Sequence, residues 1–170
     1  MIIFWVVCFI IIITIGIGIL FGGAPFVPTR RKWINEALKL ANINKDDVLV
    51  DLGSGNGEVL KLAIMSGAKR AVGYEVNSLL VWWSRFRLHK FSRQIEINNN
   101  NFFQVDLPSD TTIIYLFQID RVLRKIPNFL EQQKSNLKTK KLRVIVFGFE
   151  IPSKKPLHEK DGMRIYNFDF

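Results

Sequence analysis

The chain has little of what disulfide frameworks and metal sites require. Its 170 residues include one cysteine, Cys8, and two histidines, His89 and His158, which are far apart in the sequence. Disulfide bonds need pairs of cysteines, and structural metal sites need clustered Cys, His or carboxylate ligands. The sequence therefore predicts neither a disulfide nor a metal.

Charged residues are missing from the first part of the chain, where Arg30 is the first Lys, Arg, Asp, Glu or His. Residues 1–22 are almost wholly apolar, and about 20 such residues in a helix match the ~30 Å hydrocarbon core of a bilayer. Basic residues 30–32 follow, and positive charge favours the cytoplasmic side of a membrane. We expect one transmembrane anchor over residues 1–22, with residues 23–170 on the cytoplasmic side. A buried core helix or a cleaved signal peptide is the alternative.

The remaining residues are enough for one domain with a real core. The formal net charge of +9 belongs entirely to this part of the chain. A basic surface on a tethered domain favours contact with anionic lipid headgroups, at about 1 kcal/mol per nearby Lys or Arg. The same charge is weaker evidence for binding to RNA.

A glycine-rich motif stands at residues 48–57, which read VLVDLGSGNG. An apolar strand enters it, and a helix follows Gly57. A second apolar run, residues 71–75, then ends on Glu75. The order strand, glycine turn, helix and strand closing on an acid is typical of a nucleotide-type cofactor site. The alternative is an ordinary tight turn whose acids are solvated strand ends.

The glycine spacing distinguishes between cofactors. A dinucleotide site needs the spacing GxGxxG. Here the third glycine, Gly57, stands at the fifth position of that motif, and Glu58 takes the sixth. A carboxylate there would also repel a diphosphate. S-adenosylmethionine has no phosphate and carries a sulfonium and an ammonium group, so the motif favours it over a dinucleotide.

Each part of the motif has an expected role in holding S-adenosylmethionine. Asp51 can bind the positive groups through charge-assisted hydrogen bonds, directly or through water. Glu75 is placed to accept hydrogen bonds from both ribose hydroxyls. The predicted loop, in which glycines let the backbone pass close to the ligand, consists of Gly53, Ser54, Gly55 and Gly57.

Strands and helices alternate along the rest of the chain, which predicts an α/β fold with a Rossmann-like, doubly wound and mostly parallel sheet. Further strands are expected at 95–97, 112–117, 142–149 and, as an edge strand, 163–168. Helices are expected at 30–42, after Gly57, at 78–91 and at 120–137. In such sheets the site forms at the carboxyl ends of the strands.

Aromatic residues that follow the third and fourth strands fall at this same edge. Asn101 or the Phe102 amide could bind the adenine edge, and the Phe102 or Phe103 ring could stack on it. An apolar mouth near Phe103, Tyr115 or Phe117 would lower the pKa of an acceptor lysine and keep it neutral. Direct in-line methyl transfer needs alignment and exclusion of water, and no general base is identified. The alternative is a loop with ordinary core aromatics.

The helix expected at 78–91 is rich in aromatic and basic residues. Aromatics at this density are typical of core, so Trp82, Trp83 and Phe86 are expected to be buried. The basic residues are expected on the far, solvated side of the helix; they are Arg85, Arg87, Lys90 and Arg93.

Several segments together resemble one known family: residues 25–29 (PFVPT), 48–57, 71–77 and 101–107. In order and spacing they are similar to the small membrane-anchored class I lysine methyltransferases that act on the adenine nucleotide translocase and the ATP synthase c-subunit, and to their prokaryotic relatives. The resemblance implies S-adenosylmethionine as cofactor, with Phe26 and Thr29 beside it, and a lysine of a membrane or membrane-proximal protein as acceptor. Asn101 stands where that family has an acid.

The same cofactor half also fits other classes of protein. A methyltransferase of a small molecule, a lipid or RNA would share it, as would a non-catalytic S-adenosylmethionine-binding membrane protein. A membrane tether makes nucleic acid the less expected substrate. The oligomeric state is left open.

Overall fold

The computed structural model describes residues 5, 9, 29–152 and 154–170. Apart from Trp5 and Phe9, the expected anchor over residues 1–22 lies outside the described residues, and so does Phe26. In the described part of the chain, no helix combines the length and the apolar character that crossing a bilayer requires.

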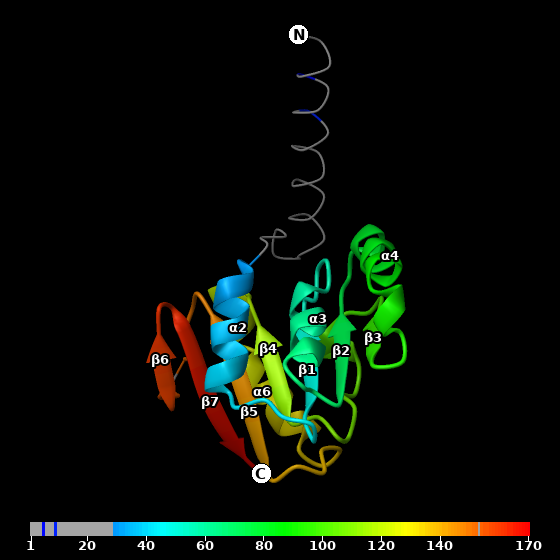
Figure 1. The fold of residues 1–170 in the computed structure, drawn as a ribbon. Coiled ribbons are helices and arrows are strands. Elements are labelled where there is room, and N and C mark those ends of the chain that lie inside the picture. Colours follow the sequence, from blue (N-terminus) through cyan, green and yellow to red (C-terminus); the bar gives the residue numbers. More distant parts are fainter. Residues whose placement is uncertain (1–4, 6–8, 10–28, 153) are drawn as a thin grey trace.

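A sheet of seven strands, in the order β3-β2-β1-β4-β5-β7-β6, forms the centre of the molecule (Figure 1). The strands are β1 (Val48–Leu52), β2 (Arg70–Tyr74), β3 (Ile95–Asn98), β4 (Ile113–Leu116), β5 (Lys141–Phe147), β6 (His158–Lys160) and β7 (Met163–Asp169). Strands β1 to β5 pair in parallel, and β7 pairs antiparallel with both β5 and β6. The expected mostly parallel, Rossmann-like sheet is confirmed.

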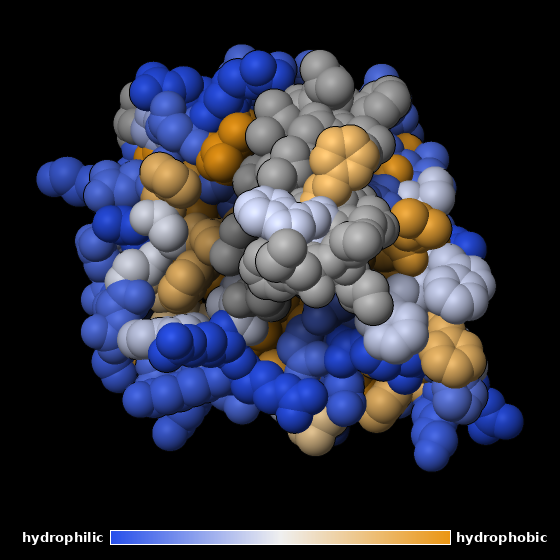
Figure 2. Space-filling model, turned by 90° about the horizontal axis from the view of Figure 1, so that it is seen from above, coloured by the Kyte–Doolittle hydropathy of each residue, from blue (hydrophilic) through white to orange (hydrophobic). Residues whose placement is uncertain are grey.

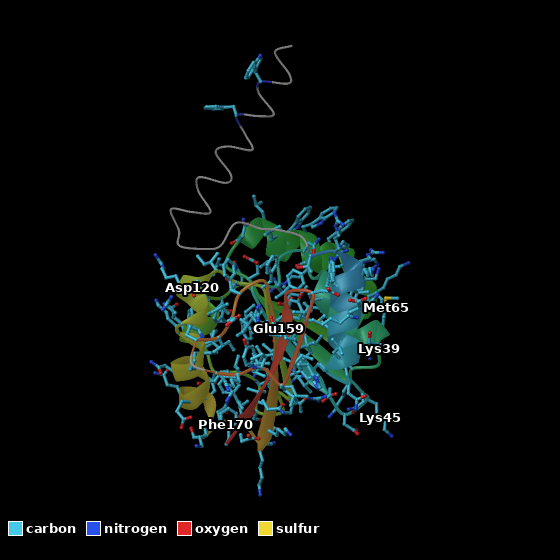
Figure 3. The ribbon with its side chains drawn as sticks, turned by 90° about the vertical axis from the view of Figure 1, so that its left-hand side faces the viewer. Lys39, Lys45, Met65, Asp120, Glu159 and Phe170 are labelled. Carbon is cyan, nitrogen blue, oxygen red and sulfur yellow. The ribbon has the colours of Figure 1, made fainter. Side chains whose placement is uncertain are left out.

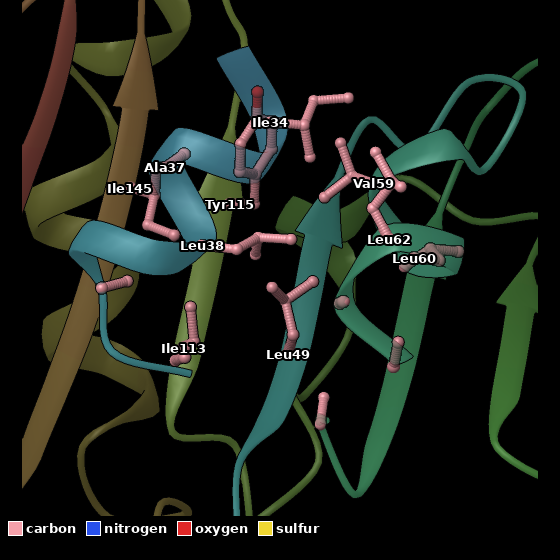
Figure 4. Packing of buried hydrophobic residues seen from close by; sticks show 14 of the residues in the cluster. Ile34, Ala37, Leu38, Leu49, Val59, Leu60, Leu62, Ile113, Tyr115 and Ile145 are labelled. Atoms are coloured by element: carbon pink, nitrogen blue, oxygen red, sulfur yellow. The ribbon is translucent and has the colours of Figure 1, made fainter. Parts of the chain in front are cut away.

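Helices cover both faces of this sheet. They are α2 (Arg31–Leu40), α3 (Glu58–Met65), α4 (Ser78–Arg87), α5 (Asp120–Leu123) and α6 (Ile126–Gln133), with short 3-10 turns η1 (His89–Phe91) and η2 (Phe102–Gln104). Successive strand residues point to opposite faces, so Leu49 packs with α2 and α3 (Figure 4), whereas Val50 packs with α6. Two apolar clusters, one on each face, fix the strands whose ends carry the site.

The expectation of a single helix over residues 120–137 is wrong. Two helices, α5 and α6, occupy part of that range, and the second has Pro127 in its first turn. Proline lacks a backbone N–H and fits the first turn of a helix, but it does not fit the interior. The chain therefore stops α5 and starts a new helix before Pro127.

The last strand is also placed differently from expectation, because β7 is interior and β6 forms the edge. Asp161 and Gly162 join these strands with φ angles of 51° and 78°. Asp-Gly with two positive φ angles is the favoured two-residue hairpin turn. Strand β6 was missed because its three residues are all exposed and carry no apolar pattern.

The aromatic side chains of α4 are not in the core, contrary to expectation. Trp82 and Phe86 are 66% and 64% exposed, and the buried residues of this helix are Val81 and Ser84. Since Val81 and Ser84 are three residues apart, they form the inward side of the helix and turn the aromatics outward.

Candidate active site

The glycine turn after β1 is tied to the end of β2. The Gly53 and Ser54 amides both donate to the Tyr74 carbonyl, at 2.9 and 3.0 Å. Gly53 has a φ of 106°, a backbone conformation that side chains other than glycine rarely adopt. The loop therefore leaves β1 sharply and begins α3 at the carboxyl edge of the sheet.

Glu75, the first residue after β2, fixes this loop from the other side. Its Oε2 accepts a hydrogen bond from the Gly55 amide at 2.9 Å, and its Oε1 accepts one from the Asn77 amide at 2.8 Å. A carboxylate offers about four lone-pair sites, so Glu75 keeps the capacity to accept from ribose hydroxyls. Asn77 in turn caps α4 by accepting from the Leu79 amide.

Asp51 is a buried acid, with 3% of its surface exposed. Burial raises its pKa to about 8, and the charge of Glu75 adds to this rise. Desolvation disfavours the ionised form of a carboxyl, and a nearby carboxylate disfavours it further. A cation bound near Asp51 and Glu75 would oppose this rise in pKa, because it would stabilise the carboxylate form.

Tyr115 lies beside Asp51, since the two are register partners across β4 and β1. In Figure 4 its ring stands between β4 and α2, near Ile34. Burial raises the pKa of Tyr115, and so does the charge of Asp51, while the nearby Thr29 hydroxyl opposes this rise. The structure thus brings Thr29 to Tyr115, although the two are far apart in sequence.

A buried polar atom at this edge, Ser54 Oγ, makes no hydrogen bond within the described residues. An unpaired buried polar group costs about 1–3 kcal/mol, so such groups usually have a partner. Ser54 Oγ and the Asp51 carboxyl are chemically suited to the sulfonium and ammonium groups of S-adenosylmethionine. The residues present therefore fit this cofactor.

Glu58, in the first turn of α3, is neutralised by two arginines. Arg31 of α2 and Arg87 of α4 approach its carboxylate to 2.7 and 2.6 Å. Burial by itself raises the pKa of Glu58, but the hydrogen bond and charge of Arg87, helped by Arg31, bring it below its usual value. The repulsion of a diphosphate expected from Glu58 is therefore weaker than the sequence suggested, and the three residues instead hold α2, α3 and α4 together.

Two residues of the site were missed at the level of sequence. Gln118 follows β4 and donates from Nε2 to the Leu52 carbonyl at 2.9 Å, so it covers Gly53. Gly73 lies in β2 where a Cβ atom would come within 2.6 Å of Ser54 Oγ. A glycine inside an apolar strand often marks a close approach of another chain segment, so Gly73 could have been identified from the sequence. No local sequence feature identifies Gln118 as part of the site.

The predicted aromatic residues divide between the two faces of the sheet. Phe117 packs edge-on against Phe147, with ring centres 5.3 Å apart, on the same face as Tyr115. Phe102 and Phe103 pack against Phe129 on the opposite face, with ring centres 5.9 and 5.5 Å from it. The expected mouth therefore brings Tyr115 and Phe117 together, and Phe103 belongs to another cluster.

Asn101 and Phe102 follow β3 at the expected edge. The exposed Asn101 side chain accepts a hydrogen bond from the Phe103 amide at 3.1 Å and so begins η2. Phe102 is 9% exposed, with its ring 4.4 Å from that of Phe103. These contacts occupy the Phe102 ring, and binding of adenine by this turn stays a prediction.

The sequence of this chain matches a known protein family. The sequence profile of the ANTKMT methyltransferase domain matches residues 51–158, from Asp51 in β1 to the first residue of β6. The chain belongs to this family. The resemblance to this methyltransferase family is confirmed, whereas the membrane anchor stays a prediction. The ANTKMT-family chain is an S-adenosylmethionine-dependent methyltransferase.

Individual relatives of this ANTKMT-family chain are also named as methyltransferases. It is 31% identical over 135 residues to a protein-lysine N-methyltransferase of Saccharolobus islandicus, covering 78% of this chain and 81% of that protein. It is 32% identical over 138 residues to the ATP synthase c-subunit lysine N-methyltransferase of Homo sapiens, covering 79% of this chain and 55% of that protein. The chain thus spans most of the archaeal relative and about half of the human one.

A solved structure supports both fold and cofactor. An RNA methyltransferase from Salinibacter ruber, crystallised with S-adenosyl-L-homocysteine, superposes with a TM-score of 0.73 at 27% identity, over 84% of this chain and 93% of that one. S-adenosylmethionine is therefore the cofactor of this ANTKMT-family chain. Its individual contacts with the predicted residues remain predictions.

Proposed function

We propose that this methyltransferase acts on a lysine side chain of a membrane or membrane-proximal protein. One observation carries the proposal: a buried acid, Asp51, lies beside Tyr115, which Thr29 contacts, at the edge where Glu75 also sits. Relatives that cover 78% and 79% of the chain are named as protein-lysine and ATP synthase c-subunit lysine N-methyltransferases, which supports lysine as the acceptor.

The cofactor, when bound, supplies an activated methyl group on a sulfonium. Asp51 at the end of β1 and Glu75 after β2 orient it, and precise alignment is the main contribution an enzyme makes to such a displacement. Tyr115 and Phe117 form an apolar wall on the β4 side of the site. Such a wall excludes water and favours the neutral, nucleophilic form of an incoming lysine by lowering its pKa.

We further propose that residues 1–22 anchor the protein in a membrane with the catalytic domain on the cytoplasmic side. The almost wholly apolar residues 1–22 and the basic residues 30–32 that follow support this arrangement. Protease treatment of sealed vesicles holding the full chain tests it. Digestion of the domain only from the cytoplasmic face agrees with the proposal, and release of the intact chain by carbonate washing contradicts it.

The acceptor is tested with the full chain in detergent-extracted membranes supplied with tritiated S-adenosylmethionine. Label in a small membrane protein, recovered as methyllysine after acid hydrolysis, supports the proposal. The D51A variant is the matched control, because it removes the carboxylate that we expect to bind the cofactor. Label in lipid or a small molecule contradicts the proposal, and cofactor binding without any transfer indicates a non-catalytic binding protein.

RNA methylation is a second candidate, favoured by the formal charge of +9 and by the Salinibacter ruber RNA methyltransferase. The same incubation distinguishes the two, since a ribonuclease releases label from RNA and a protease releases it from protein. Label that is lost only with ribonuclease would replace lysine with RNA as the acceptor.

A further inference from the structure

An exposed apolar surface covers the outer side of α4. It consists of five residues, which we name the α4 face: Val76, Leu79, Trp82, Trp83 and Phe86. Their exposed fractions lie between 46% for Trp83 and 75% for Leu79. Large apolar side chains gathered on one surface in this way mark an interaction site, whereas single exposed ones do not.

The α4 face is a fixed stripe. Residues three and four positions apart lie on one side of a helix, and this spacing joins Leu79, Trp82, Trp83 and Phe86. The Trp82 and Phe86 rings stack with 6.1 Å between their centres and 9° between their planes. Buried Val81 and Ser84 hold the opposite side of the helix against the domain. The rings are therefore presented outward by a helix that is already in place.

Positive charge surrounds this stripe. Residues 76–93 contain no Asp or Glu and carry four cations, Arg85, Arg87, Lys90 and Arg93. Arg87 pairs with Glu58, but Arg85 contacts only the Ile97 carbonyl among described residues, so its charge is not neutralised there. Lys90 and Arg93 are exposed. The surroundings of the α4 face are complementary to an anionic surface.

We propose that the α4 face docks on an anionic lipid bilayer. Tryptophan prefers the headgroup level of membranes, and helices with an apolar aromatic side and neighbouring cations bind in that layer. Each cation near an anionic leaflet strengthens binding by about fivefold. A protein partner would also accept aromatic rings, but four cations and no acid within residues 76–93 favour a surface of uniform negative charge over the mixed charges of a protein surface.

The position of α4 makes this docking compatible with catalysis. Helix α4 lies at the end of the domain where α2 begins, which is also the end at which the parallel strands finish (Figure 1). Viewed from that end, apolar side chains lie at the surface over α4 (Figure 2). Tyr115 is on β4, two strands away from β2, after which α4 starts. The bilayer would therefore contact the cofactor side of the edge and leave the Tyr115 side open to an acceptor.

Docking is tested by tryptophan fluorescence in the full chain, with a readout that does not depend on methyl transfer. The chain has four tryptophans, and W5F and W33F leave Trp82 and Trp83 as the reporters. The protein is reconstituted in vesicles of phosphatidylcholine with phosphatidylglycerol, prepared with and without bromine on the acyl chains. We expect brominated lipid to reduce the emission by about half and the emission to shift to the blue, as for rings at the headgroup level.

A matched reporter is placed at the other end of the domain. Lys45 is exposed and lies just before β1 begins, away from α4 (Figure 3). A chain with K45W as its one tryptophan, made with W5F, W33F, W82F and W83F, should show no quenching. A W82Q and F86Q pair in the first reporter chain, with Trp83 retained, should lose most of the quenching and keep the fold, because both side chains are exposed.

The outcomes decide the proposal. Quenching of the α4 reporter that requires phosphatidylglycerol, with none at K45W, supports docking on an anionic bilayer. Quenching that is equal in pure phosphatidylcholine overturns the role of charge and with it the proposal. A blue-shifted but unquenched α4 reporter shows that another part of the chain covers the face. Quenching at both reporters shows insertion without orientation, and both of these results overturn the proposal.

Discussion

Asp51 and Tyr115 are partners across β1 and β4, and both point to the face of the sheet that α2 and α3 cover. Asp51 is buried without an opposing cation among the described residues, and its charge adds to burial in raising the pKa of the Tyr115 hydroxyl. A fold gains nothing from such a pair when no ligand is bound. Groups with shifted pKa values in this kind of arrangement are typical of functional sites.

Replacing the acid at this position should separate stability from binding. In D51N we expect affinity for S-adenosylmethionine to fall by about 10- to 100-fold, because hydrogen bonds to charged groups contribute about 1.5–3 kcal/mol. The unliganded variant should be more stable than the wild type at pH 7 by on the order of a few kcal/mol, since it no longer buries an ionisable carboxyl. Titration calorimetry and urea unfolding measure the two effects.

The stability gain of D51N should depend on pH with a defined sign. The pKa of Asp51 is raised from 3.8 to about 8 on folding, so its stabilising contribution is present below pH 3.8 and declines as the pH rises towards 8. The difference between D51N and wild type should therefore vanish near pH 4. Asp106 is exposed, and D106N serves as the matched control, with no change expected. A constant difference at all pH values would contradict this interpretation.

Cofactor binding should release a proton below pH 8. Unliganded Asp51 is then protonated, and a positively charged cofactor favours the carboxylate. We expect the affinity of the wild type to rise by close to tenfold per pH unit as pH 8 is approached and then to level off. Calorimetry at pH 7 in buffers with different heats of ionisation should find about one proton released. The slope and the proton release should both be absent in D51N.

All three tyrosines should resist ionisation in the folded protein. Burial raises the pKa of Tyr74, Tyr115 and Tyr166 above 10, the usual value. Absorbance at the tyrosinate band should therefore rise at a higher pH in the folded protein than in the unfolded protein. A tyrosine whose pKa is higher in the folded than in the unfolded protein stabilises the fold while it is protonated in both states. This contribution declines once the pH exceeds the pKa of the unfolded state, so the free energy of unfolding should fall above pH 10. In concentrated guanidinium chloride, ionisation near pH 10 is expected for all three.

Gly73 should be intolerant of a methyl group. In G73A the new Cβ would lie 2.6 Å from Ser54 Oγ and 2.7 Å from a Leu60 methyl, so the glycine loop must shift. Overpacking of this kind costs about 1–3 kcal/mol, and we expect weaker cofactor binding as well. In the double variant S54G/G73A the contact with Ser54 is relieved, and part of the stability should return. Wild-type stability in G73A itself would show that β2 and the loop are not in close contact.

Local sequence determined the cofactor half of the site. The φ angle of Gly53, the acids at the ends of β1 and β2, and the cap at Asn77 are each specified within a short segment of the chain. The hydrogen bonds that tie the loop to Tyr74 and Glu75 join residues from two separate segments. Alternation of strand and helix fixed the class of fold for the same reason, because each element forms from its own periodicity. The exceptions were local as well, as with Pro127, whose missing N–H divided one expected helix into two.

Tertiary structure decided which distant side chains meet. Tyr115 lies beside Asp51 because β4 is the neighbour of β1, and no short-range pattern specifies that strand order. Glu58 is neutralised because α2 and α4 bring Arg31 and Arg87 to the same carboxylate. The helical pattern of α4 defines two sides, but contact with the domain selected the one with Val81 and Ser84. Burial and pairing are properties of the packed chain, and so the sequence by itself left the charge of the site and the exposure of its aromatics undetermined.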